Sequence, residues 1–186
     1  AATSLHRLDR RADYDGQMAA DKDAFADVLA GNASYANSFV DAGLSGVAGQ
    51  GLAIITCIDS RINPLAAVGM KAGDVKIIRN AGAHVTDDVL RTLVLATYLL
   101  NVNRVLVMPH TDCRMANNSE AEIHANIMDR HGVDTRSMEF NTIDDQAKVL
   151  EIGLTRIESF PLLPDDLQVA GALYDVHTGR LEMFAR

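Results

Sequence analysis

The feature that most constrains the fold is a short run of consecutive apolar residues, Leu52-Ala53-Ile54-Ile55. The run follows a glycine-rich stretch and ends in two β-branched residues, a pattern typical of a strand that is covered on both faces. Strands of this kind belong to parallel sheets that lie between layers of helices. The run therefore predicts an α/β domain.

Strand and helix patterns alternate after this run. Further strands are expected at residues 75–78, 105–108 and 168–174, and a last one at 181–184 after a turn at His177-Thr178-Gly179. Helix starts are expected at Pro64, at Asp87 with Thr86 as its N-cap, at Asn117 or Asn118, and at Thr142. We expect a mainly parallel central sheet in the order 2-1-3-4, with strand 5 antiparallel at the edge and helices on its faces.

The first 45 residues have a helical pattern instead. Met18, Phe25, Val28 and Leu29 follow a 3.6-residue period, and Gly31-Asn32 is expected to separate this helix from a second, short one. A chain of 186 residues has the size of one domain. We expect a single domain over residues 1–186, with an N-terminal helical arm at 1–45 and an α/β core at 52–186.

The charge of the chain excludes some classes of partner. With 25 acidic and 17 basic side chains, the formal net charge is −8, which argues against a nucleic-acid surface or a patch for anionic membranes. The longest apolar stretch, residues 89–100, is far shorter than the roughly 20 residues of a membrane span. We expect a cytoplasmic protein; a removed leader stays possible, since the chain begins with Ala1 and not with Met.

The two cysteines, Cys57 and Cys113, are too few for a disulfide scaffold and leave three alternatives: free thiols, one disulfide, or metal ligands. Cys57 follows the first predicted strand, and His110 and Cys113 follow the third. If these strands are neighbours, their carboxyl ends form the crevice in which α/β proteins bind ligands. We therefore expect both cysteines and His110 to converge there.

Two thiolates and one imidazole suit zinc, which prefers four sulfur and nitrogen ligands in a tetrahedron. Three protein ligands leave one position open, as in catalytic sites, whereas structural sites close it with a fourth side chain. The spacing of His110 and Cys113 is weak evidence by itself, and a turn histidine or a disulfide between the cysteines remains an alternative.

Two charged residues, Asp59 and Arg61, follow Cys57 at alternate positions. In an extended segment the three side chains would lie on one side. Asp59 could then occupy the open zinc position, or a guanidinium fork from Arg61 could hold it ionised and away from the metal. A solvated surface pair is the simpler alternative.

These segments resemble the β-class carbonic anhydrases. Cys57-Ile58-Asp59-Ser60-Arg61 and His110-Thr111-Asp112-Cys113 are similar to the C-x-D-x-R and H-x-x-C motifs of that family. Residues 78–82 resemble its R-N-A-G segment, and residues 25–39 its N-terminal helical arm. The resemblance extends from about residue 20 to the end of the chain and is specific to the superfamily, not to one substrate.

The resemblance implies a zinc enzyme with Cys57, His110 and Cys113 as metal ligands and an Asp59–Arg61 catalytic dyad. It implies reversible hydration of carbon dioxide to bicarbonate by a zinc-bound hydroxide, in a homodimer or larger homo-oligomer whose N-terminal helices embrace the partner. Hydrolysis of carbonyl sulfide or carbon disulfide at the same site is an alternative, because close relatives catalyse it. A non-catalytic zinc or redox-sensing protein, in which Asp59 closes the tetrahedron, is a second alternative.

Three further residues are candidates for smaller roles. Gly82 and Arg114 are candidate substrate-binding residues, although Arg114 stands where many members of the family have glycine. His84 is a candidate proton shuttle because a free histidine titrates near neutral pH, with a packing or capping role as the simpler alternative. The chain has no tryptophan, so the tryptophan-containing bicarbonate site of some relatives does not carry over.

Overall fold

The computed structural model describes residues 24–40 and 43–185 of the chain. The chain divides into two compact units, Ala1–Leu44 and Ser45–Arg186, and the second contains the whole sheet. The boundary lies near the one predicted between arm and core. That the two make a single domain stays a prediction.

In the first unit, helix α2 spans Ala26–Ser38 and has no buried residue. The expected break at Gly31-Asn32 is wrong, because the helix continues through both residues. Glycine in a helix costs only about 1 kcal/mol relative to alanine, and this helix contains four alanines, the strongest helix former. Met18, the first residue of the predicted pattern, lies outside the described residues.

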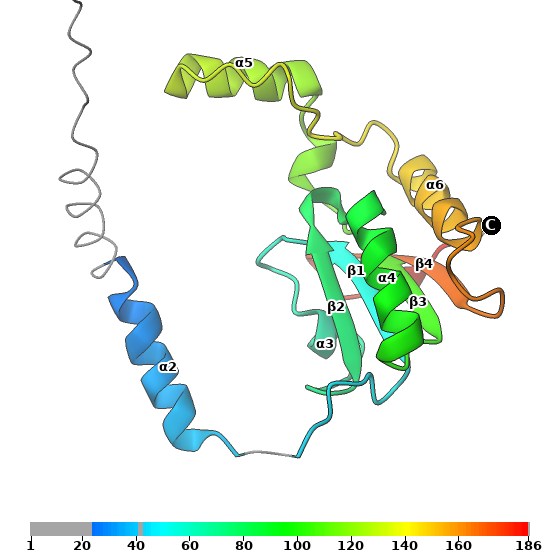
Figure 1. Ribbon diagram of the computed structural model, residues 1–186. Helices are drawn as coiled ribbons and strands as arrows, with labels where there is room; N and C mark the ends of the chain where they lie inside the picture. Colours follow the sequence, from blue (N-terminus) through cyan, green and yellow to red (C-terminus); the bar gives the residue numbers. More distant parts are fainter. Residues whose placement is uncertain (1–23, 41–42, 186) are drawn as a thin grey trace, which may run out of the picture. The chain divides into compact units, whose positions relative to one another are not determined.

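The second unit is built on a five-stranded sheet in the order β2-β1-β3-β4-β5 (Figure 1). The pairs β1–β2, β1–β3 and β3–β4 are parallel, and β4–β5 is antiparallel, so the predicted fold class is confirmed. The strands are β1 Leu52–Cys57, β2 Val75–Asn80, β3 Arg104–Met108, β4 Gln168–Tyr174 and β5 Leu181–Met183.

The connections between the strands are helical. They are α3 Pro64–Ala67, the 3-10 turn η1 Ala81–Ala83, α4 Asp87–Leu99, the 3-10 turn η2 Arg114–Ala116, α5 Glu120–His131 and α6 Gln146–Glu158. Thr86 caps α4 as predicted, by accepting a hydrogen bond from the backbone N–H of Val89. No helix in residues 24–40 and 43–185 is long and apolar enough to cross a membrane.

Two predicted helix starts are displaced. Ser119, not Asn117 or Asn118, caps α5, because its hydroxyl accepts from the N–H of Glu122 while the Glu122 carboxylate accepts from the N–H of Ser119. Helix α6 starts after Asp145, whose carboxylate accepts from Lys148, and not at Thr142. In both cases the chosen cap satisfies an N–H in the first turn.

Strand β1 lies inside the sheet, between β2 and β3, and all six of its residues are buried. Ala53 and Ile55 belong to a core that includes residues of α4 and α6, whereas Leu52 and Ile54 belong to a second core that includes Cys57 and Cys113. This alternation explains why the run is apolar throughout: successive side chains point to opposite faces, and both faces are covered.

The capping box of α5 gives a stability test. We expect Ser119→Ala to lower the free energy of unfolding by about 0.5–2 kcal/mol, because the first turn of α5 loses its side-chain acceptor. Asn118→Ala, one residue earlier, is the matched control and should change it by less than about 0.5 kcal/mol. Urea unfolding of the three proteins measures both values; a larger loss for Asn118→Ala would contradict the assignment.

Candidate metal centre

The site lies at the carboxyl ends of the neighbouring strands β1 and β3. Cys57 is the last residue of β1, and His110 and Cys113 follow β3; all three are buried. The end of β4 holds the second loop in place, since Tyr174 donates its N–H to the carbonyl of Pro109 and accepts from the N–H of Thr111. The two loops thus meet at one crevice, as predicted.

The donor atoms of Cys57, His110 and Cys113 lie within 4.8 Å of one another. The two sulfur atoms are 4.0 Å apart and not joined, so both cysteines are free. Nε2 of His110 is buried and has no hydrogen-bond partner in the described part of the chain. Because Nδ1 lies 2.8 Å from the carbonyl oxygen of Thr111, which can only accept, Nδ1 carries the proton and Nε2 presents a lone pair.

This arrangement fits zinc. Two sulfurs bound to one tetrahedral zinc at about 2.3 Å lie about 3.8 Å apart, close to the separation found here. A buried imidazole nitrogen without a partner is unfavourable unless something binds it, and a metal ion would. Cys57, His110 and Cys113 could therefore hold a zinc ion and leave its fourth position open.

The environment of the sulfur atoms bears on metal binding. Burial raises the pKa of the Cys113 thiol, and the neighbouring Cys57 raises it further. The thiol therefore carries a proton at neutral pH until a metal ion displaces it. The backbone N–H of Gly82 points at the sulfur of Cys57, 3.4 Å away, and would stabilise the thiolate form.

Asp59 and Arg61 form the predicted fork. Arg61 donates from Nε to Oδ1 of Asp59 at 3.0 Å and from Nη2 to Oδ2 at 2.7 Å. The segment is not extended: the chain turns at Ser60 and Arg61, and the backbone N–H of Arg61 also donates to Asp59 Oδ1. Hydrogen bonds from Arg61 hold the pKa of Asp59 well below its usual range, so Asp59 stays ionised. Its Oδ2 lies 3.8 Å from Nε2 of His110.

Arg79 fixes the loop that carries Cys57 and Asp59. Its guanidinium donates to three backbone carbonyls of that loop: Cys57 at 2.8 Å, Asp59 at 2.6 Å and Ile62 at 3.3 Å. Sequence analysis placed Arg79 only in the R-N-A-G segment and did not predict this role. No pattern along the chain indicates that a residue on β2 binds three carbonyls at and after the end of β1.

The next residues shape the turn that presents Gly82. The Asn80 amide donates to the carbonyl of His84 at 2.7 Å and accepts from its N–H at 2.8 Å. Gly82 has φ +82°, and a Cβ there would lie 2.8 Å from the His84 ring. Nε2 of His84 is buried without a hydrogen-bond partner among the described residues, and its shuttle role stays a prediction.

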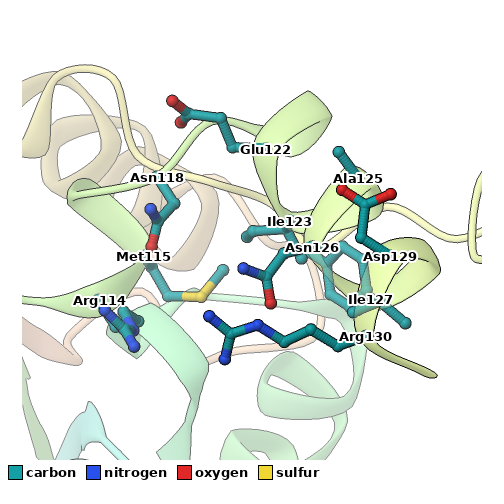
Figure 2. Close-up of a pocket in the computed structure, with 11 residues that line it drawn as sticks. Arg114, Met115, Asn118, Glu122, Ile123, Ala125, Asn126, Ile127, Asp129 and Arg130 are labelled. Carbon is teal, nitrogen blue, oxygen red and sulfur yellow. The ribbon is translucent and has the colours of Figure 1, made fainter.

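Arg114 lines a different space from the three donor residues. Figure 2 shows its side chain at a cavity of about 690 Å³ between η2 and α5, together with Met115, Asn126 and Arg130. None of Cys57, His110 and Cys113 lines this cavity. The predicted substrate-binding roles of Arg114 and Gly82 stay predictions.

Comparisons with known proteins agree with this geometry. The family model described as carbonic anhydrase matches residues 52–181, the range that holds strands β1 to β4 and the candidate metal centre. The chain belongs to the β-carbonic anhydrase family. Members of this family use zinc, and the similarity to them shows that this chain is an enzyme.

Individual members of the family show how far the similarity reaches. Beta-carbonic anhydrase 1 of Mycobacterium tuberculosis is 34% identical over 156 residues, 83% of this chain and 94% of that protein. A carbonic anhydrase structure from Streptococcus mutans superposes with a TM-score of 0.81 at 33% identity, over 87% of this chain and 97% of the other. Carbon disulfide hydrolase of Acidianus sp. is 26% identical over 152 residues, 69% of this chain and 74% of that protein.

Gly82 gives a test of how the R-N-A-G segment supports the metal centre. We expect Gly82→Ala to weaken zinc binding, because the new Cβ meets the His84 ring and displaces the N–H that points at Cys57. Gly69→Ala is the control: Gly69 has φ +66°, but a Cβ there meets nothing within 4 Å.

Both substitutions should lower the free energy of unfolding, Gly69→Ala by about 1–2 kcal/mol for the left-handed backbone alone. Only Gly82→Ala should also lower zinc affinity, measured by competition with a chelator. Equal zinc affinity in the two variants would show that the Gly82 amide does not matter to the site.

Proposed function

We propose that this protein catalyses the reversible hydration of carbon dioxide to bicarbonate, with a zinc ion held by Cys57, His110 and Cys113. The observation that carries the proposal is the geometry at the fourth position. Three buried donor atoms converge, and an ionised carboxylate, Asp59, lies beside them while Arg61 holds it. When bound, zinc supplies a Lewis acid that makes water a nucleophile near neutral pH.

In this proposal Asp59 orients the nucleophile. An ionised carboxylate can only accept hydrogen bonds, so it would accept a hydrogen bond from an attacking water and direct the oxygen lone pair toward the carbon of the substrate. Arg61 keeps Asp59 ionised and keeps it from reaching the metal, because both carboxylate oxygens already accept from the guanidinium.

The remaining residues support the metal centre or are candidates for smaller roles. Arg79 fixes the loop of Cys57 and Asp59, and the Gly82 N–H stabilises the Cys57 thiolate. His84 remains our candidate for passing the released proton to solvent. Arg114 remains a candidate substrate-binding residue, although the cavity that it lines in Figure 2 contains none of the three donors.

We also propose that the protein acts as a homodimer or larger homo-oligomer. On α4 the side chains of Leu95, Tyr98 and Leu99 are 45%, 62% and 67% exposed. In the first unit, the N-cap Phe25 and the α2 residues Leu29 and Tyr35 are all more than half exposed. Exposed apolar side chains on each of these two helices favour association between copies.

Hydrolysis of carbonyl sulfide or carbon disulfide is the second candidate, favoured by the relatives named carbon disulfide hydrolase. Both reactions begin with a nucleophile at zinc attacking a linear triatomic molecule, so the same donor residues serve either. The higher identity to the mycobacterial carbonic anhydrase, 34% against 26%, favours carbon dioxide.

A direct assay distinguishes the candidates. We expect the zinc-loaded protein to hydrate carbon dioxide rapidly, measured by stopped-flow pH change, and to release little hydrogen sulfide from carbonyl sulfide or carbon disulfide. Sulfide release with negligible hydration would reverse the choice. Full zinc occupancy without turnover on any of the three substrates would favour a non-catalytic zinc protein.

Asp59→Asn tests the role of the dyad. We expect the variant to retain zinc, because Asp59 is not among the three donors, but to lose about 100-fold or more in kcat/KM, because the amide no longer accepts and orients as a carboxylate does. Asp134→Asn is the matched control: Asp134 and Arg136 form a similar fork, and they contribute no donor to the metal centre. Unchanged kinetics in Asp59→Asn would rule out the proposed dyad.

A further inference from the structure

Arg61 contacts a second carboxylate besides Asp59. Its Nη1 donates to Oδ2 of Asp112 at 2.8 Å, and its Nη2 donates to the backbone carbonyl of Asp112 at 3.1 Å. Asp112 lies between His110 and Cys113 in the H-x-x-C segment. Arg61 therefore links the loop after β1 to the loop after β3, and these two loops together carry all three candidate metal donors.

The comparison with Asp134 and Arg136 shows what this second contact adds. In that pair the N–H, Nε and Nη2 of Arg136 lie 3.1, 2.9 and 2.7 Å from the Asp134 oxygens. The corresponding distances from Arg61 to Asp59 are 2.9, 3.0 and 2.7 Å. The fork is thus a local structure that an Asp-x-Arg segment adopts without a metal centre. The Arg61 fork differs from the Arg136 fork by its further contacts with Asp112.

The local fork is open to competition from water. Its bidentate geometry is favourable, but the Arg61 side chain is 41% exposed, so water competes for the guanidinium. A guanidinium shared by two carboxylates from two loops is fixed at both ends, and networks of this kind hold better than isolated pairs. Asp112 is itself held, because the Asn117 amide donates to its Oδ1 at 3.2 Å.

The backbone of Asp112 supports the same interpretation. Its φ of +54° lies in the left-handed region, where aspartate and asparagine are tolerated better than most residues. This conformation directs the Asp112 carboxylate and carbonyl toward one guanidinium. The backbone is thus strained at the position where the two loops meet, as is common beside functional sites.

We propose that Asp112 is a positioning residue that keeps the fourth metal position open. This proposal rests on the proposed function. Asp112 fixes Arg61, and Arg61 in turn keeps Asp59 beside the metal without letting it bind the metal. Without Asp112, Arg61 is held by the local fork alone, where water competes for it, and Asp59, whose Oδ2 lies 3.8 Å from Nε2 of His110, is released from the guanidinium more often. A carboxylate there would bind the metal and close the tetrahedron.

The experiment uses the full-length protein with cobalt in place of zinc, since the visible spectrum of cobalt reports its ligands. Azide is the probe, because a small anion binds only where the fourth position is free. Asp112→Gly removes the carboxylate while glycine keeps the positive φ without strain. Asp112→Asn keeps the shape and the local acceptor but removes the charge.

We expect both variants to retain one cobalt ion per chain. Azide affinity should fall about tenfold or more in Asp112→Gly, because it falls with the fraction of molecules whose fourth metal position is free. In Asp112→Asn it should fall less. Adding Asp59→Asn to Asp112→Gly should restore azide binding toward the wild-type value, because the competing carboxylate is gone. Asp134→Asn, the distant control, should bind azide as the wild type does.

Wild-type azide affinity in Asp112→Gly would overturn the proposal. So would a double variant that binds azide as weakly as the single one, because the loss would then not act through Asp59. Loss of cobalt from both Asp112 variants would also overturn it, by placing Asp112 in assembly of the ligand set. A wild type without carbon dioxide hydration would refute the proposed function alone, because the azide results do not depend on turnover.

Discussion

The parallel pairing of β1 with β3 is the constraint on which the rest of the structure depends. It places the carboxyl ends of the two strands side by side, so that Cys57 from one and His110 and Cys113 from the other reach one point. All six residues of β1 are buried, and they contribute to cores on both faces of the sheet. The crevice is therefore supported by the most rigid part of the domain.

Around this pairing the loops are held by charged and polar groups that bind backbone. Arg79 binds three carbonyls of the loop after β1, and the Gln146 amide of α6 donates to the carbonyl of His110 at 2.8 Å. Arg61 connects the two loops through Asp59 and Asp112. A catalytic metal centre needs donors held to within a fraction of an ångström, and these contacts provide that support.

Much of this arrangement could be predicted from the sequence. The mainly parallel sheet follows from alternating strand and helix patterns, whereas its strand order was assumed, and the three donor residues were chosen from their places just after two strands. The cap of α5 was predicted one or two residues early, because Asn117, Asn118 and Ser119 are all good caps. Ser119 forms the capping box with Glu122, whereas Glu120, three residues after Asn117, accepts from the N–H groups of Phe140 and Thr142. The break at Gly31-Asn32 was wrong because the surrounding alanines outweigh one glycine.

The sequence by itself determined the elements and the local fork of Asp59 with Arg61, because each depends on neighbours a few residues apart. The pair Asp134 and Arg136 forms a similar fork from a similar segment, which shows how local that structure is. Only the tertiary structure decided that Arg61 also binds Asp112 and that Arg79 reaches the loop of Cys57. Those contacts join residues that are 51 and 22 positions apart, and no spacing rule along the chain specifies them.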